Sequence, residues 1–252
     1  MSNYIKLINN LDYLKLDTFK QNIDLYIDLV NNGEKTFVDA LYELTEKDKD
    51  FRTERANVAM VKTANFPFIK TFDDYDFSYQ PSINKSEIID FKDLRFMQNA
   101  ENLLFVGTPG TGKTHLAVSI GIAAARNRFM TYFINCNELL AQLKKAKIEN
   151  RLHQRLKHFF SYSLLIIDEV EFLPIDDLED ANLFFQLIAM RYEKRSTIIT
   201  TNKSFNKWGE VFGDTVIANA ILDRLLHHSK VIQVIGSSYR LKDKKYLMED
   251  AD

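Results

Sequence analysis

Eight residues, 107–114 (GTPGTGKT), have the spacing of a phosphate-binding loop, G-x-x-x-x-G-K-[ST]. Glycines let such a loop turn its backbone N–H groups inward, and these groups, with the positive end of the following helix, hold phosphate oxygens. Lys113 is expected to reach the β- and γ-phosphates of a nucleotide, and the Thr114 hydroxyl is expected to bind Mg²⁺. The predicted nucleotide contacts are Gly107, Thr108, Pro109, Gly110, Thr111, Gly112, Lys113, Thr114 and His115.

The residues on either side of this loop are those that the motif requires. The apolar run 103–106 leads into it as a predicted buried strand, and residues 115–120 leave it with helical spacing. A glycine-rich turn that binds nothing is the alternative. The strand before the loop and the helix after it argue against that alternative.

Two acids, Asp168 and Glu169, follow the apolar run 163–167. In nucleotide-hydrolysing P-loop proteins the first such acid holds the Mg²⁺ shell, and the adjacent one can polarise the attacking water. Many buried strands end in surface acids, so the pair alone is a weak signal. A phosphate loop about fifty residues upstream makes it strong, because the carboxyl ends of parallel strands open onto one ligand crevice.

A third polar residue, Asn202, ends the β-rich run 196–201. Its amide could position the attacking water or contact the γ-phosphate. Asparagine also favours turns, and without the other motifs the turn would be the preferred interpretation.

Short β-rich runs alternate with helical stretches along the second part of the chain. The predicted strands are 103–106, 130–135, 163–167, 197–201 and 231–235. This alternation predicts an α/β fold, a P-loop core with a parallel five-stranded sheet flanked by helices. A helix capped by Ser86 is expected to lead into the first strand.

The first part of the chain differs from this core. Residues 4–62 contain no proline and one glycine, with apolar residues at mixed three and four spacing, and predict a small all-helical domain joined near residues 31–33. The aromatic-rich segment 64–85 predicts a strap packed on a surface, with Phe77 as a guess for the residue that covers the adenine. The predicted domains are 1–63, a protein-contact or assembly module, and 64–252.

Composition excludes several classes of protein. The single cysteine, Cys136, rules out an internal disulfide and a zinc ribbon, and His227 and His228 have no neighbour at metal-ligand spacing. The start of the chain lacks an uninterrupted signal-peptide core, and no apolar run approaches the roughly 18 residues that span a bilayer. A soluble, cytoplasmic protein without membrane contact is expected.

Positive charge is concentrated in residues 144–157. Six basic residues and one acid give this segment a local charge of +5 in a chain of net charge −2. Such a face is often merely solvated, and nucleic-acid backbone is the alternative partner. The predicted DNA contacts are Lys144, Lys145, Lys147, Arg151 and Arg155. No recognition-helix pattern is present, so base-specific contacts are not expected.

From about residue 66 onward the chain resembles the IstB/DnaC-like family of AAA+ ATPases, and within it the helpers of bacterial insertion-sequence transposition. The matching stretches are 101–103 with 107–117 (GTPGTGKTHLA), 164–174 (LLIIDEVEFLP), 191–193, 196–202 (STIITTN), 208–214 (WGEVFGD), 220–228 (AILDRLLHH) and 236–241 (GSSYRL). The stretch 220–228 is the most family-specific. Thr108 stands where a second proline is usual, and Glu171-Phe172 stands where Gly-Tyr is usual.

The resemblance implies ATP hydrolysis with Mg²⁺ in a core without a C-terminal helical lid. It implies that Asn202 is a sensor residue, that Arg224 is an arginine finger acting on a neighbouring subunit, and that subunits associate into a ring or helical oligomer. The helical pattern after Asp214 agrees, because it places Arg224 at the margin of a buried stripe. The implied catalytic residues are Lys113, Asp168, Glu169, Asn202 and Arg224.

The leading hypothesis is an ATP-dependent regulator that assembles on duplex DNA and recruits or stimulates a transposase. In the resembled family, the basic segment corresponds to a helical element that lines DNA. A replicative helicase loader shares the core and is the nearest competing hypothesis. A small-molecule phosphotransferase and a non-hydrolysing nucleotide-binding adaptor would use the same phosphate loop and are weaker hypotheses.

Overall fold

The computed structural model describes residues 2–171 and 178–244. The chain divides into two compact units, of which the first ends at Ala59 and the second begins at Met60. The division falls within the residues of one helix, α3 (Phe37–Thr63).

The first unit is entirely helical among its described residues. It contains α1 (Asn3–Tyr13), α2 (Asp17–Asn31) and the larger part of α3. Leu11, Phe19, Ile23, Tyr26, Ala40 and Leu44 form its buried core. The connection between α2 and α3 passes through Gly33, whose φ of 73° suits glycine. The predicted helices and their junction near residues 31–33 are confirmed.

The second unit is built on a five-stranded sheet in which every strand pair is parallel. The strands are β1 (Asn102–Gly107), β2 (Thr131–Asn135), β3 (Leu164–Asp168), β4 (Ser196–Thr201) and β5 (Ser229–Val234). Their order is β2-β3-β4-β1-β5. β1 therefore lies inside the sheet, and the loop that follows it leaves from the carboxyl edge between β4 and β5. The predicted parallel α/β architecture is confirmed.

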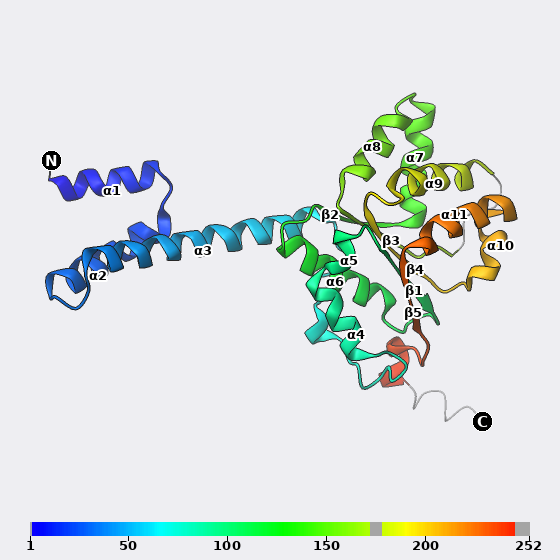
Figure 1. The fold of residues 1–252 in the computed structure, drawn as a ribbon, viewed down its shortest axis with the longest axis horizontal. Coiled ribbons are helices and arrows are strands. Elements are labelled where there is room, and N and C mark those ends of the chain that lie inside the picture. Colours follow the sequence, from blue (N-terminus) through cyan, green and yellow to red (C-terminus); the bar gives the residue numbers. More distant parts are fainter. Residues whose placement is uncertain (1, 172–177, 245–252) are drawn as a thin grey trace. The chain divides into compact units, whose positions relative to one another are not determined.

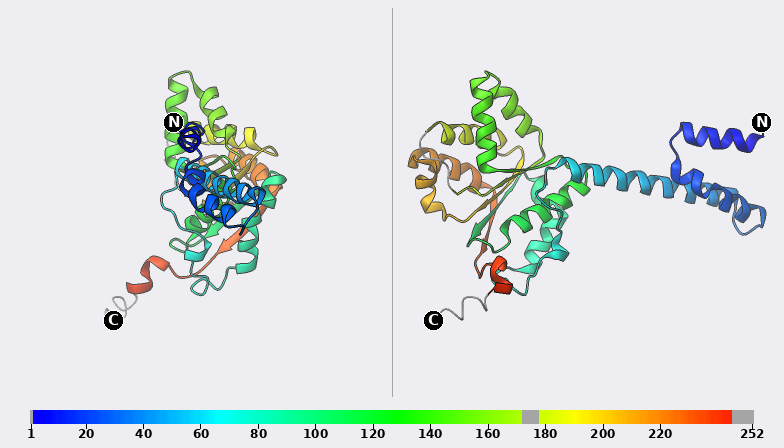
Figure 2. Two further views of the ribbon diagram at one scale, coloured as in Figure 1. Left: turned by 90° about the vertical axis from the view of Figure 1, so that its left-hand side faces the viewer. Right: turned by 180° about the vertical axis from the view of Figure 1, so that it is seen from behind.

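Alternate side chains of the strands point to opposite faces of the sheet, and each face has its own helices (Figure 1). Leu104, Ile167 and Ile199 pack with α7 (Cys136–Ile148), α8 (Leu152–Ser161), α9 (Leu178–Arg191), α10 (Trp208–Phe212) and α11 (Thr215–His227). Leu103, Phe105 and Ile198 pack on the other face with α6 (Lys113–Arg126) and with residues 83–96. The reverse view in Figure 2 shows the same three layers.

The segment 64–85 belongs to the second unit and packs against its sheet. Asn65 Nδ2 donates to the carbonyl of Phe133 on β2 at 3.1 Å, and the carbonyl of Ala64 accepts from the Phe133 N–H at 2.8 Å. This segment contains η1 (Phe72–Asp74), and the next elements along the chain are α4 (Lys85–Asp90), η2 (Phe91–Asp93) and α5 (Arg95–Gln98). Two further short elements are η3 (Phe205–Lys207) and η4 (Tyr239–Lys244).

The predicted Ser86 cap is wrong by two residues. Asn84 caps α4, because its Oδ1 accepts from the N–H groups of Ser86 at 3.1 Å and Glu87 at 3.4 Å. Asparagine and serine are both good helix caps, and an Asn two residues before a Ser leaves the start of a helix ambiguous in the sequence.

Within the described ranges, no helix has the length and apolar character needed to cross a bilayer.

A buried arginine, Arg191, fastens the end of α9 to the sheet. The residue is 1% exposed, and its guanidinium donates to the carbonyls of Phe159 at 2.8 Å, Tyr162 at 3.0 Å and Ser196 at 2.5 Å. Its Nε donates to Thr197 Oγ1 at 3.0 Å. One side chain thus joins α8, α9 and β4.

We expect Arg191→Met to lower the free energy of unfolding by about 3 kcal/mol, because several buried oxygen atoms lose their donors. Urea denaturation followed by circular dichroism measures this change. Arg195→Met, which removes the same charge at an exposed position four residues later, is the control and should cost much less. Equal losses in the two variants would contradict the anchoring role.

Candidate nucleotide-binding site

A cleft of about 690 Å³ lies at the carboxyl edge of the sheet. Residues of the phosphate loop, of the strand ends, of the strap and of the last described segment line it. They are Pro67, Phe68, Lys70, Asp74, Tyr75, Asp76, Gln80, Pro109, Gly110, Thr111, Gly112, Lys113, Thr114, His115, Phe133, Asn135, Asp168, Glu169, Glu171, Thr200, Asn202, Tyr239 and Arg240. The fold therefore brings the predicted contacts 109–115, both acids of the pair and Asn202 to one cavity, whereas Gly107 and Thr108 are not in its lining.

The phosphate loop needs its glycines for two reasons. Gly110 has φ 77° and Gly112 has φ 92°, both in the left-handed region. A Cβ on Gly112 would lie 2.6 Å from the Tyr75 ring, and one on Gly110 would lie 2.1 Å from Ser238 Oγ. Any other residue would strain the loop and push these neighbours away.

Segments on both sides hold the loop through its backbone carbonyls. The Tyr75 hydroxyl donates to the Thr111 carbonyl at 2.9 Å, and the Tyr239 N–H donates to the Gly110 carbonyl at 2.8 Å. Thr108 Oγ1 donates to the Gly236 carbonyl at 2.9 Å. The Thr108 side chain therefore adds a bond between the loop and the residues after β5.

Lys113 is only 8% exposed and lies against its own loop. Its Nζ donates to the carbonyls of Gly107 at 2.9 Å and Thr108 at 2.8 Å. Burial lowers the pKa of Lys113, and the neighbouring carboxylates of Glu171 and Asp168 oppose that shift. A cation held in this way is available to phosphate oxygens that enter the cleft.

Thr114 and Asp168 lie together as the sequence predicts. Thr114 Oγ1 donates to Asp168 Oδ1 at 2.9 Å, and Thr200 Oγ1 donates to the same carboxylate oxygen at 2.6 Å. Burial raises the pKa of Asp168, while the bonds from Thr200 and Thr114 partly lower it. Carboxylate and hydroxyl oxygens are hard donors of the kind that Mg²⁺ prefers, so this pair fits that ion.

Glu169 is held in a backbone conformation that is uncommon outside glycine, with φ 57°. Its N–H donates to Thr200 Oγ1 at 2.9 Å, and its Oε2 accepts from Asn135 Nδ2 at 2.9 Å. Asn135 Oδ1 also accepts from the Asn137 N–H at 3.0 Å and so caps α7. Asn135 at the end of β2 thus positions the carboxylate, while Thr200 on β4 holds the backbone of Glu169.

Asn202 is paired with Glu171, the residue that stands where glycine is usual in the resembled family. Asn202 Nδ2 donates to Glu171 Oε2 at 2.6 Å, and the Asn202 N–H donates to Oε1 at 3.1 Å. Burial raises the pKa of Glu171, and the charge of Glu169 adds to this shift. Phe172, the other unusual residue, lies outside the described residues.

The strap presents aromatic groups to the cleft. Phe68 and Tyr75 line it, and the His115 ring contacts both edge-on, with centroid distances of 6.1 Å and 5.3 Å. Phe77, the residue guessed to cover the adenine, packs against the Tyr75 ring and the apolar core instead. Phe77 is not part of the described cleft lining.

Arg224 lies on α11, outside the lining of its own cleft. Its guanidinium donates to the Ala220 carbonyl at 2.8 Å and lies 4.8 Å above the Phe185 ring. α11 begins at Thr215 and is capped by Asp214, as the sequence pattern predicts. The position agrees with a side chain at the margin of the buried stripe formed by Ile221 and Leu225.

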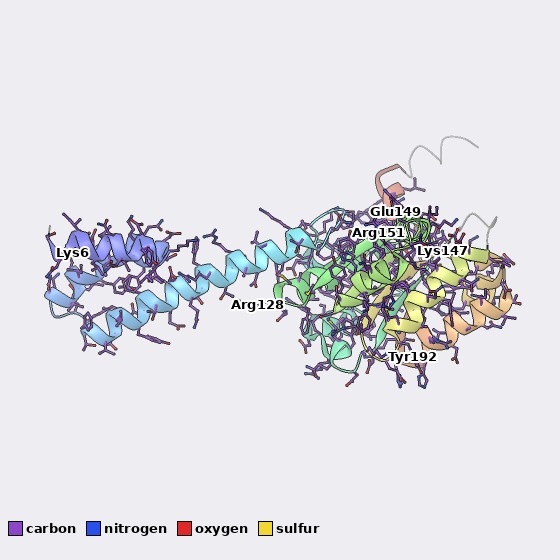
Figure 3. The ribbon with its side chains drawn as sticks, turned by 90° about the horizontal axis from the view of Figure 1, so that it is seen from above. Lys6, Arg128, Lys147, Glu149, Arg151 and Tyr192 are labelled. Atoms are coloured by element: carbon purple, nitrogen blue, oxygen red, sulfur yellow. The ribbon has the colours of Figure 1, made fainter. Side chains whose placement is uncertain are left out.

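The five predicted DNA contacts lie on α7, on α8 and in the turn between them. Figure 3 shows Lys147, Glu149 and Arg151 close together at this end of the second unit. Lys144 pairs with Asp180 at 2.8 Å, and Lys147 pairs with Glu179, both acids on α9. These two acids reduce the local charge from +5 to +3.

Several cleft residues were not assigned to the site from the sequence, and three of them contact the catalytic groups or Asn202. They are Asn135, Thr200 and Glu171. Asn135 and Thr200 could have been found, because each is a polar residue near the carboxyl end of a predicted strand. Glu171 could be recognised only as a departure from a family pattern.

These features define a P-loop nucleotide-binding domain with the AAA+ fold. The chain belongs to the family of IstB-like ATP binding proteins, whose model matches residues 9–246. The ATP-binding protein of insertion sequence IS232 from Bacillus thuringiensis subsp. berliner is 55% identical over 242 residues, which cover 96% of each chain.

Solved structures support the fold. A DnaC helicase loader superposes with a TM-score of 0.54 at 23% identity, covering 69% of this chain and 98% of the loader. A replication initiator DnaA bound to AMPPCP and single-stranded DNA superposes with a TM-score of 0.56 at 15% identity, covering 71% of this chain and 54% of the initiator.

We expect Glu171→Gln to tighten ATP binding more than ADP binding. A carboxylate in the cleft repels phosphate charge, and its removal is worth about 1 kcal/mol for the extra phosphate, or roughly fivefold in affinity. Titration of a fluorescent ATP analogue, with ADP in parallel, measures the ratio of dissociation constants. Glu210→Gln, on α10 outside the cleft lining, should leave the ratio unchanged. An unchanged ratio in Glu171→Gln would contradict the expectation.

Proposed function

We propose that this protein hydrolyses ATP and uses the nucleotide state to control its assembly on duplex DNA, where it recruits or stimulates a transposase. The observation that carries the proposal is the convergence of Lys113, the Thr114–Asp168 pair and Glu169 in one cleft. A lysine for phosphate, oxygen ligands for a metal ion and a positioned carboxylate are the groups that hydrolysis of a nucleotide requires.

The role of each group follows from its position. Thr114 and Asp168 would hold Mg²⁺, which neutralises phosphate charge when it is bound. Lys113 would bind the terminal phosphates. Glu169, which Asn135 holds at 2.9 Å, would orient and polarise the attacking water. Asn202 would contact the terminal phosphate or that water once its bonds to Glu171 open.

Arg224 supports an assembled active site. It lies outside its own cleft, so we propose that it acts at the γ-phosphate held by a neighbouring subunit. A cation supplied at the transition state is worth about 10³-fold or more in rate. Hydrolysis would then require self-association into a ring or a helical oligomer.

The basic face of α7 and α8 is the proposed contact with the DNA backbone. The ion pairs with α9 reduce the net charge of this face. Lys145 and Arg151 are exposed, and Arg151 pairs with Glu149 beside it. Asn135 caps α7 and also donates to the Glu169 carboxylate. One residue therefore contacts both the helix that carries part of the proposed DNA contact and the proposed catalytic carboxylate. The insertion-sequence context of the relative favours a transposase as partner.

A helicase loader is the second candidate because its fold is shared. Co-purification of the full chain with a transposase and, separately, with a hexameric helicase distinguishes the two partners. Retention of the helicase alone would favour the loader. A phosphotransferase would transfer phosphate to an acceptor, whereas the proposed function releases free phosphate.

We expect Lys113→Ala and Arg224→Ala each to lose at least about 10³-fold in ATPase rate, and their mixture to regain about a quarter of the normal rate. In the mixture, an intact loop of one subunit can meet an intact arginine of the other. Phosphate release in the presence of duplex DNA measures this recovery. Glu169→Gln should bind ATP without hydrolysing it. Normal activity of Arg224→Ala alone would contradict a role for Arg224, and no recovery on mixing would contradict its action in trans.

We expect Lys145→Ala and Arg151→Ala to weaken duplex binding, and each to reduce the magnitude of the salt slope by about 1. Glu179→Gln should tighten binding, because it removes an acid that faces Lys147. Fluorescence anisotropy over a series of salt concentrations measures both effects. Lys92→Ala, an exposed lysine elsewhere in the second unit, is the control. Equal effects of the Lys92 and Lys145 variants would contradict this DNA interface.

A further inference from the structure

Two segments far apart in the sequence bring three metal-ligating side chains together on the surface of the second unit. Glu193 lies in the turn between α9 and β4, whereas His227 and His228 lie at the end of α11. Glu193 Oε1 is 3.6 Å from His227 Nδ1 and 3.4 Å from His228 Nε2. All three donor atoms lie within 4.8 Å of one another.

These distances suit one bound ion. A tetrahedral Zn²⁺ with bonds of about 2.0–2.2 Å holds its ligands roughly 3.3–3.5 Å apart. The two distances from Glu193 Oε1 are already close to this spacing. An ion could therefore be bound with small side-chain rotations and without movement of the backbone.

We propose that Glu193, His227 and His228 form a binding site for a divalent transition-metal ion, with Zn²⁺ as the best fit. Two imidazole nitrogens and one carboxylate oxygen are ligands that Zn²⁺ accepts, and the fourth position is filled by water. The side chains are about half exposed, so the ion can enter from solvent.

The backbone explains how adjacent histidines can share one ion. α11 ends at His227, and His228 leaves the helix with φ −123° and ψ 81°. The two rings consequently lie close together, with centroids 4.0 Å apart and their planes tilted by 49°. In a continuous helix, neighbouring residues point about 100° apart around the axis and would not converge in this way.

Glu193 is held toward the histidines by an unusual turn. Its φ is 57°, a left-handed value that non-glycine residues seldom adopt. The N–H groups of Lys194 and Arg195 donate to the Arg191 carbonyl at 2.9 Å and 3.0 Å. The buried guanidinium of Arg191 donates to the Ser196 carbonyl on β4, so the turn that carries Glu193 is anchored to the sheet.

A hydrogen bond competes with the ion for one ligand. The Tyr192 hydroxyl lies 2.7 Å from His227 Nδ1, and a bound ion needs the lone pair of that nitrogen. Metal binding should therefore displace Tyr192, and Tyr192→Phe should bind Zn²⁺ at least as tightly as the natural protein. If the three side chains formed only a hydrogen-bonded cluster and no metal site, there would be no reason to expect zinc binding by Tyr192→Phe.

The site is separate from the proposed function. None of its three residues lines the described cleft, and in Figure 3 Tyr192 lies at the opposite edge of the unit from Lys147 and Arg151. Its effect would be to fasten the end of α11, one turn beyond Arg224, to the turn before β4. Failure of the metal proposal would leave the ATPase proposal unchanged.

Zinc titration of the tag-free full chain, in competition with a chromophoric chelator, tests the proposal. We expect one equivalent per chain, and a loss of roughly tenfold or more in affinity for Glu193→Gln and for His228→Ala. Tyr192→Phe should retain binding, and His153→Ala, an exposed histidine on α8, is the matched control. The absorption spectrum of bound Co²⁺ should show low-symmetry four-coordinate geometry, and the same variants should lose it.

Thermal unfolding provides a second measurement. Zn²⁺ should raise the Tm of the natural protein and of His153→Ala, because an ion that binds the folded state stabilises it, and at the same zinc concentration it should raise the Tm of Glu193→Gln less. Nucleotide binding by Glu193→Gln shows that this variant folds. No zinc binding, or zinc binding that neither Glu193→Gln nor His228→Ala weakens, would overturn the proposal.

Discussion

The hydrogen bonds that Asp168 accepts from Thr114 and Thr200 join three separate parts of the fold. Thr114 begins α6, Asp168 ends β3, and Thr200 lies near the end of β4. They can meet only because these strands are parallel and in register, so that their carboxyl ends reach one edge. A shift of β3 or β4 by one residue would turn Asp168 or Thr200 to the opposite face. Strand register therefore assembles this group of side chains even when no ligand is bound.

The same cleft gathers like charges at a cost to the unliganded protein. Asp168, Glu169 and Glu171 all line it, and burial raises the pKa of Asp168 and of Glu171. Lys113 opposes this concentration of negative charge, although burial lowers its own pKa. A site with this balance binds a cation and a polyanion better together than either alone, because each neutralises charge that disfavours the other.

The sequence predicts those features that depend on local pattern. The phosphate loop, the five strands and the helices of the first unit follow from residue spacing, because a loop motif and hydrophobic periodicity need no knowledge of distant contacts. Glu193 could not be assigned to the histidines, since it lies 34 positions before His227 and the packing of α9 with α11 brings these residues together. The acids of α9 were missed in the same way, because Glu179 meets Lys147 only after α7 and α9 pack together.

The phosphate loop is held mainly through carbonyl oxygens of the main chain, which Tyr75 and the Tyr239 N–H reach from two sides. Every residue offers such an oxygen whatever its side chain. Relatives can therefore exchange residues along these contacts and keep the loop geometry, provided that a donor survives on the partner segment. Thr108 adds a contact of a different kind, because its side-chain hydroxyl donates to the main-chain carbonyl of Gly236. Divergence in this neighbourhood is then expected to be greater in side chains than in backbone shape.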